Sequence, residues 1–166
     1  GKLLARIEAS GKGDLYIPGA FFYIEKLEKA GRILSFRPIA QHTPVIGVNR
    51  DREETVKGFD DLSRPGVRLA MGDPKAMAFG RTAMAILDRS GQKEAILQNV
   101  VVYGATVKQL ALYVSQGSVD AAIIGRADAF QNQDRIKMVS IPEAYFHAEV
   151  IAGAILDSTV NPELSE

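Results

Sequence analysis

Two glycine-containing turns hold the main-chain groups with the clearest chemical potential. One spans residues 71–80 (Met-Gly-Asp-Pro-Lys-Ala-Met-Ala-Phe-Gly) and the other residues 103–107 (Tyr-Gly-Ala-Thr-Val), each between a strand pattern and a helix pattern. Small residues let the main chain approach a ligand closely, and the first N–H groups of a helix lack intrahelical partners. Two such helix starts aimed at one point would bind an anion without a cationic side chain. The same spacing also fits ordinary turns in which Thr106 only caps its own helix.

The other candidate groups indicate no enzyme. His42 and His147 have no carboxylate or second histidine at metal-ligand spacing, so we predict no metal site. The acidic pairs 53–54 and 60–61 lie in polar stretches, and adjacent side chains point apart on a helix, which is typical of solvated surface. Residues 11–14 lack the spacing of a phosphate-binding P-loop, and no Gly-x-Ser-x-Gly elbow occurs. We therefore predict neither catalysis nor a cofactor.

Composition narrows the class of protein further. The 166 residues are 46% hydrophobic and 24% charged, as in soluble globular proteins. Lys plus Arg and Asp plus Glu each number 20, so no basic field exists to hold a nucleic acid. The absence of cysteine excludes disulfides and thiolate chemistry. No apolar run approaches the roughly 20 residues that cross a bilayer, and no signal-peptide pattern is present, as in an exported protein shown without its leader.

Short strand-like and helix-like segments alternate along the chain. Apolar periodicity predicts helices over residues 3–9, 21–30, 59–62, 80–90 and from 106 onward. Strands are predicted over residues 15–17, 43–49, 68–71, 100–103, 121–124, 137–140 and 148–156. This alternation indicates an α/β architecture with largely parallel sheets, whose ligands lie beyond the carboxyl ends of the strands.

At these turns the chain resembles the molybdate-binding family of periplasmic solute-binding proteins, a subset of the type II periplasmic binding protein fold. The matching stretches are residues 4–9 (LARIEA), 14–17 (DLYI), 63–74 (SRPGVRLAMGDP), 107–114 (VKQLALYV) and 117–124 (GSVDAAII). They follow the family's order over nearly the whole chain. The LAMGDP run followed by Gly80 is their most specific part.

The resemblance implies two three-layer α/β lobes joined by crossover hinge strands near residues 45–49 and 125–128. Lobe I would consist of residues 1–44 and 127–166, incomplete at both chain ends, and lobe II of residues 45–126. A tetrahedral oxyanion such as molybdate or tungstate would lie in the cleft between the lobes.

The family's contacts can be carried over by position. The resemblance implies that the backbone N–H groups of Phe79 and Val107 bind the oxyanion, with Ala78 and Thr106 beside them. These positions lie at the same two helix starts that the glycine-containing turns at residues 71–80 and 103–107 indicate.

Three further positions depart from the family pattern or lie at its margin. Gly125 stands where relatives place a tyrosine hydroxyl, and Arg126 follows it. The Arg126 guanidinium could replace the neutral donor and favour a larger or more highly charged anion, or could be an ordinary surface group. Gly1 would adjoin a serine-containing loop that contacts the ligand in relatives.

The function implied is that of the substrate-binding component of an ABC importer, with the oxyanion and a membrane permease as partners. The protein would be periplasmic or extracellular, associated with the membrane through the permease or a lipid anchor. Unpaired sheet edges in an incomplete lobe would favour a homodimer. Two alternatives remain open: a regulatory sensor domain of the same fold that binds another small anion, suggested by Gly125, and a transferase acting on a phosphorylated metabolite.

Overall fold

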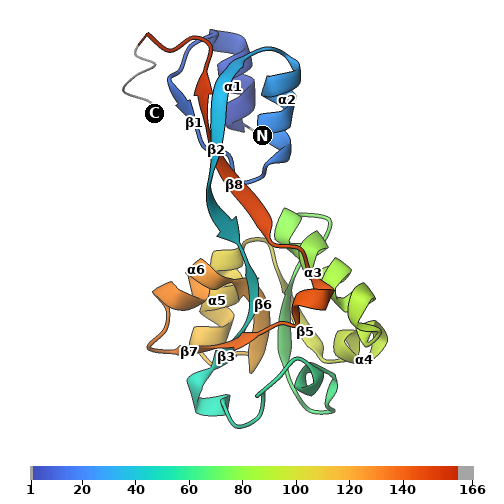
Figure 1. Cartoon of the computed structure of the whole chain (residues 1–166). Helices are drawn as coiled ribbons and strands as arrows, with labels where there is room; N and C mark the ends of the chain where they lie inside the picture. The colour runs from blue at the N-terminus through green and yellow to red at the C-terminus, as the bar shows by residue number, and fades with distance from the viewer. Residues whose placement is uncertain (1, 161–166) are drawn as a thin grey trace. The chain divides into compact units, whose positions relative to one another are not determined.

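The chain folds as two units whose hydrophobic cores are separate. The computed structural model describes residues 2–160, apart from the side chains of residues 2 and 78. Unit 1 comprises Gly1–His42 and Ala148–Glu166, and unit 2 comprises Thr43–His147. The labels of Figure 1 are used for the elements of both units.

Unit 1 is a three-stranded antiparallel sheet with helices packed on it. Its sheet has the order β1-β8-β2, and the buried residues Ala152 and Ala154 of β8 pack against Leu4, Ile24 and Leu27 of the two helices. The elements are α1 (Lys2–Ser10), β1 (Leu15–Tyr16), α2 (Phe22–Lys29), β2 (Ile33–His42) and β8 (Glu149–Leu156).

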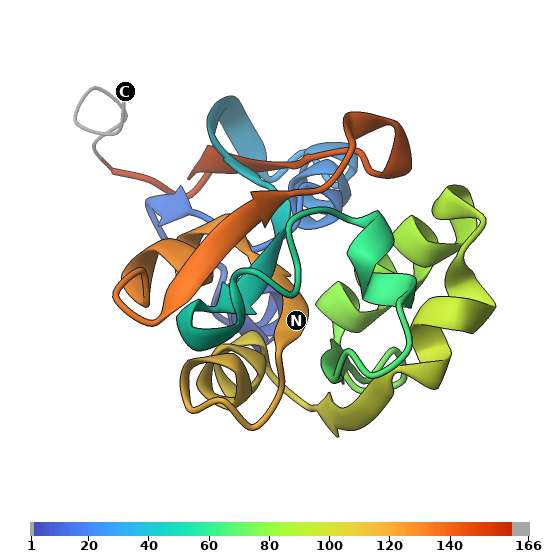
Figure 2. The same ribbon diagram turned by 90° about the horizontal axis from the view of Figure 1, so that it is seen from below.

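Unit 2 is a five-stranded sheet with the order β5-β4-β6-β3-β7 and helices on both faces (Figures 1 and 2). Its strands are β3 (Pro44–Asn49), β4 (Leu69–Gly72), β5 (Val100–Gly104), β6 (Ala121–Gly125) and β7 (Ile136–Ser140). Its α-helices are α3 (Ala78–Ser90), α4 (Lys93–Gln98), α5 (Val107–Ser115) and α6 (Arg126–Gln131). Three 3-10 helices complete it: η1 (Arg50–Arg52), η2 (Asp60–Ser63) and η3 (Glu143–Tyr145).

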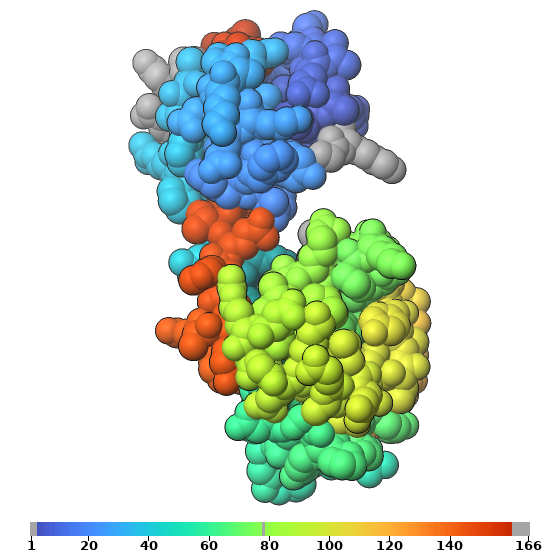
Figure 3. Space-filling view, turned by 90° about the vertical axis from the view of Figure 1, so that its right-hand side faces the viewer, coloured from blue at the N-terminus to red at the C-terminus, as the bar shows by residue number. Residues whose placement is uncertain are grey.

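The core of unit 2 follows the alternation of side chains along its strands. Leu69 and Met71 of β4 belong to the cluster formed with α3 and α4, whereas Ala70 between them belongs to the cluster formed with α5 and α6. The outer surfaces of α3 and α4 form the yellow-green face of unit 2 in Figure 3. Burial of both sheet faces explains why β3, β4 and β6 read as continuous apolar runs in the sequence.

The predicted strand directions need a correction. β4 pairs in parallel with β5 and β6, as expected, but β3 pairs antiparallel with β6 and β7. The sheet of unit 1 is antiparallel throughout its described pairings. The expectation of largely parallel sheets therefore holds only for the strands that are linked by helical crossovers.

The division of the chain also differs from the expected lobes. Residues 127–147, expected in lobe I, belong to unit 2 because β7 pairs with β3 from Val45–Ser140 to Asn49–Ile136. The chain therefore passes between the units at residues 42–43 and 147–148. The segment near 125–128, expected as a hinge strand, instead contains the end of β6 and the start of α6.

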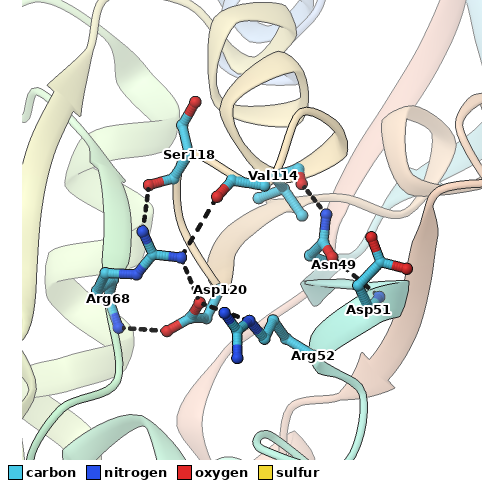
Figure 4. Close-up of polar contacts among 8 residues, drawn as sticks. Asn49, Asp51, Arg52, Arg68, Val114, Ser118 and Asp120 are labelled. Atoms are coloured by element: carbon cyan, nitrogen blue, oxygen red, sulfur yellow. Dashed lines mark hydrogen bonds and ion pairs between the residues drawn. The ribbon is translucent and has the colours of Figure 1, made fainter.

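A polar cluster fixes the edge of the sheet at which β4 and β6 begin (Figure 4). The buried Asp120 carboxylate accepts hydrogen bonds from the Arg68 backbone N–H at 2.9 Å and from Arg68 Nη2 at 2.7 Å. Arg52 Nε lies 3.9 Å from Asp120 Oδ1. Burial opposes ionisation of Asp120, but the hydrogen bonds and charge of Arg68, with the charge of Arg52, hold its pKa below the usual value.

Asn49 connects the same edge to the last turn of α5. Its side-chain Nδ2 donates to the Val114 carbonyl oxygen at 2.7 Å, and its Oδ1 accepts from the Asp51 N–H at 2.9 Å. The side chain is buried, so both of its polar groups need these partners. The carboxyl end of α5 is thereby held at one edge of the sheet, with its amino end directed toward the other.

Candidate functional site

The two glycine-containing turns lie side by side at one edge of the unit 2 sheet. Gly72, the last residue of β4, is the register partner of Gly104, the last residue of β5. The Asp73 N–H donates to the Gly104 carbonyl oxygen at 3.0 Å, so the turns are also hydrogen-bonded to each other. β6 lies parallel on the other side of β4 and ends at Gly125. Three adjacent strands therefore end in glycine, and a helix follows each of them.

The first turn is stabilised by hydrogen bonds to Asp73 before α3 begins. Asp73 Oδ1 accepts from the Lys75 N–H at 2.8 Å, and the Asp73 carbonyl oxygen accepts from the Met77 N–H at 3.0 Å. A Cβ atom at Gly80 would lie 2.6 Å from the carbonyl oxygens of both Gly72 and Asp73. Only glycine allows the first turn of α3 to approach the end of β4 so closely.

Phe79 contributes its side chain to the core rather than to the turn. Its ring is buried in the hydrophobic cluster that contains Met71 and Ala83. Ala78 and Phe79 are the first two residues of α3, so both backbones lie in the first helical turn. A ligand at this position would meet the main chain of Phe79 and not its ring.

The second turn ends in a well-formed helix cap. Thr106 Oγ1 accepts from the Gln109 N–H at 3.2 Å, and Gln109 Oε1 accepts from the Ala105 N–H at 3.0 Å. The first intrahelical bond of α5 runs from the Leu110 N–H to the Thr106 carbonyl oxygen. In the described part of the chain, neither the Val107 nor the Lys108 N–H has a hydrogen-bond partner.

The remaining predicted residues lie at or beyond the same edge. Gly125 is the register partner of Pro44 in β3, and the Arg126 N–H donates to the Thr43 carbonyl oxygen at 2.9 Å. The exposed Arg126 side chain lines a cavity beside β3 and β7, which no residue of the β4 and β5 turns lines. Gly1 lies outside the described residues.

The cavity includes residues that the sequence analysis did not single out, among them Ser140, Glu143 and Phe146. Ser140 ends the predicted strand over residues 137–140, and Glu143 and Phe146 follow it; the direction of this strand in the sheet could not be known from its local pattern. Because β7 is antiparallel to β3, it ends at the edge where β3 begins. That edge is also where β6 ends.

The described residues show neither metal-ligand clustering nor a membrane-spanning helix. Over residues 2–160, no three or more His, Cys, Asp or Glu side chains gather in a way that could hold a metal ion. Within the same residues, no helix combines the length and the apolar character needed to cross a bilayer.

Comparisons with known proteins place the chain in a family. The family model described as bacterial extracellular solute-binding protein matches residues 1–166. A putative binding protein of Haemophilus influenzae is 33% identical over 166 residues, covering 100% of this chain and 68% of that protein. The molybdate-binding protein ModA of Mycobacterium tuberculosis is 26% identical over 166 residues, covering 99% of this chain and 61% of that protein.

A solved structure extends the likeness to three dimensions. The substrate-binding domain of a putative molybdenum ABC transporter from Clostridium difficile superposes with a TM-score of 0.89 at 21% identity, covering 99% of this chain and 72% of that chain. At this identity the likeness shows the fold alone, which is the type II periplasmic binding protein fold. The expected fold class is confirmed.

Proposed function

Because the chain belongs to the family of bacterial extracellular solute-binding proteins, it is a binding protein and not an enzyme, and we propose that it delivers its solute to an ABC importer. The proposal includes a membrane permease as its partner and a site of action outside the cytoplasm. The permease partner is supported by the name of the Clostridium difficile structure, a substrate-binding domain of a putative molybdenum ABC transporter. The location is supported by the name of the family, bacterial extracellular solute-binding protein.

The proposed solute is a tetrahedral oxyanion of the molybdate or tungstate type. One observation carries this proposal: the Gly72–Gly104 pairing brings together the turns that lead into α3 and α5, and the start of α5 has two uncommitted N–H groups, those of Val107 and Lys108. Helix starts attract anions because their N–H groups point outward along the positive end of the helix dipole. The molybdate-binding mycobacterial relative supports the choice of oxyanion.

In this proposal the oxyanion contacts the main chain of Phe79 and Val107, with Ala78 and Thr106 beside it. Neutral donors suit a transport receptor, because they can bind a dianion without a fixed cation that would hold it permanently. Gly125 offers no side-chain donor at the third strand end. Further donors for the oxyanion would come from other residues of the protein. The chain spans 68% of the length of the Haemophilus relative.

Titration calorimetry of the chain, and of the gene product that contains it, tests the proposal. We expect molybdate and tungstate to bind more tightly than sulfate and phosphate. Binding of none of these four anions by either protein would refute an oxyanion receptor. Tight binding of phosphate or sulfate alone would keep the receptor function but change the solute.

A further inference from the structure

A cavity of about 250 Å³ lies between the start of α6 and the segment that follows β7, entirely within unit 2. Its volume is below the ~300–1,000 Å³ of pockets for drug-sized ligands, so it fits a smaller molecule. The lining residues that matter for its chemistry are Thr43, Arg126, Met138, Ser140, Ile141, Glu143 and Phe146.

The cavity is separate from the β4 and β5 turns. β3 and β7, which line it, are the second and third strands beyond β4 in the sheet. No residue of the two turns lines the cavity, and with neighbouring strands ~4.8 Å apart its β3 and β7 walls lie roughly 10 Å or more from Gly72, although Arg126 follows β6, the strand next to β4. A single tetrahedral oxyanion at the turns would not reach the β3 and β7 walls, so the cavity would hold a different ligand.

Two oppositely charged side chains are available in the cavity. Among the described residues, neither the Arg126 guanidinium nor the Glu143 carboxylate has a hydrogen bond or ion pair, and both residues are exposed. Arginine is the side chain best suited to bidentate binding of a carboxylate or phosphate. An ionised carboxylate accepts hydrogen bonds only, so Glu143 would favour a hydroxyl or ammonium donor.

The rest of the lining combines hydroxyl groups with carbon. Thr43 and Ser140 contribute hydroxyls, which can donate or accept, whereas Met138, Ile141 and Phe146 contribute apolar surface. Apolar surface offers no hydrogen-bond donors that could replace the water around an inorganic ion. It does pack well against the carbon skeleton of an organic ligand. The Glu143 charge would also repel a bare dianion.

We propose that this cavity is a second ligand site of unit 2, which binds a small organic acid carrying a hydroxyl or ammonium group. Arg126 holds the acidic group, Glu143 accepts from the donor, and the carbon skeleton lies against Met138, Ile141 and Phe146. The site does not depend on the oxyanion function, and it assigns Arg126 to a ligand other than the oxyanion.

Calorimetry of the chain with three three-carbon probes tests the site. Glycerate supplies a carboxylate and hydroxyls, serine a carboxylate and an ammonium group, and propionate a carboxylate alone. We expect glycerate and serine to bind more tightly than propionate. Arg126→Gln should weaken glycerate binding by about tenfold or more. Arg135→Gln is the matched control, because Arg135 is an exposed arginine before β7 that does not line the cavity.

Glu143→Gln gives a readout that a merely structural role would not produce. Loss of the negative charge should weaken serine binding and strengthen propionate binding. The proposal is overturned if no probe binds, if Arg126→Gln and Arg135→Gln behave alike, or if saturating molybdate displaces glycerate. Glycerate binding in a chain that fails to bind molybdate would support this site without deciding the oxyanion proposal, which is tested separately with all four anions.

Discussion

The Asp73 N–H and the Gly104 carbonyl oxygen, 3.0 Å apart, join the turn after β4 to the turn after β5. This bond extends the β4–β5 ladder by one residue beyond the paired glycines Gly72 and Gly104. The two turns are therefore joined directly by the main chain just before α3 and α5 begin. Main-chain donors on turns that are already hydrogen-bonded cost less ordering entropy on binding than donors on a loop that must order around the ligand.

Val107→Pro should weaken oxyanion binding without disrupting α5. Val107 is the first residue of the helix, where proline is well tolerated, and Thr106 has the extended backbone (φ −141°, ψ 153°) that a following proline requires. The substitution removes one proposed donor N–H, which is worth about 1.5–3 kcal/mol toward a charged acceptor. The dissociation constant, measured by calorimetry, should rise about tenfold or more.

Val107→Ala is the control for that substitution, because it shortens the side chain but keeps the N–H. It should retain the wild-type affinity within a small factor. Equal loss of affinity in both variants would show that the side chain, and not the main-chain donor, matters at this position.

Gly80→Ala should destabilise unit 2 and disturb the turn before α3. The new Cβ would lie 2.6 Å from two backbone carbonyl oxygens, which cannot move aside as a flexible side chain could. We expect a loss of about 1–3 kcal/mol in the free energy of unfolding, as for other overpacked sites. Urea denaturation measures this loss. Gly58→Ala is the matched control, since nothing lies within 4 Å of the Cβ that it would add, and wild-type stability in Gly80→Ala would contradict the close approach.

Strands buried on both faces were the most predictable elements of the fold. Residues 43–49 and 121–124 read as continuous apolar runs, and β3 and β6 occupy them within one residue at each end. β2 was not predicted, because most of Ile33–His42 is exposed and Pro38 interrupts it. This edge strand is defined by main-chain bonding to β8, which side-chain periodicity does not record.

The turns of the candidate site can be predicted one by one from the sequence, but their adjacency cannot. The glycines at 72 and 104 indicate two turns that could approach a ligand, and Thr106 is expected either beside the ligand or as a helix cap; the structure shows the cap. Their adjacency depends on the strand order β5-β4-β6-β3-β7, which is set by tertiary packing. The same order places residues 127–147 in unit 2 and not in the expected lobe I, since β7 returns to pair with β3.

Thr106→Ala should lower the stability of unit 2 more than it lowers the affinity for the oxyanion. The hydroxyl caps α5 through the Gln109 N–H, and loss of such a cap costs about 0.5–2 kcal/mol. Thermal or urea unfolding should show this loss, and Thr106→Ser, which keeps the hydroxyl, should restore most of it. If Thr106→Ala instead weakened molybdate binding as strongly as Val107→Pro at unchanged stability, the hydroxyl would be a ligand contact rather than a cap.

Asp120 should make the stability of unit 2 depend on pH on the acid side. Its pKa is lower in the folded protein than in the unfolded chain, because the hydrogen bonds and charges of Arg68 and Arg52 outweigh the effect of burial. The ionised carboxylate therefore contributes stability that is fully present above the ordinary aspartate pKa of ~3.9. That contribution is lost as the pH falls from this value through the lower pKa of the folded state, where Asp120 becomes protonated.

Asp120→Asn removes the titrating group while keeping a side chain of similar size. At neutral pH the variant should lose about 1–3 kcal/mol in the free energy of unfolding, because Arg68 then lacks its charged partner. Between pH 5 and pH 2, roughly the range in which an aspartate titrates, the stability difference from the wild type should shrink. Urea unfolding across this range measures both effects. A difference that stays constant with pH would mean that the Arg68–Asp120 pair does not shift the Asp120 pKa on folding.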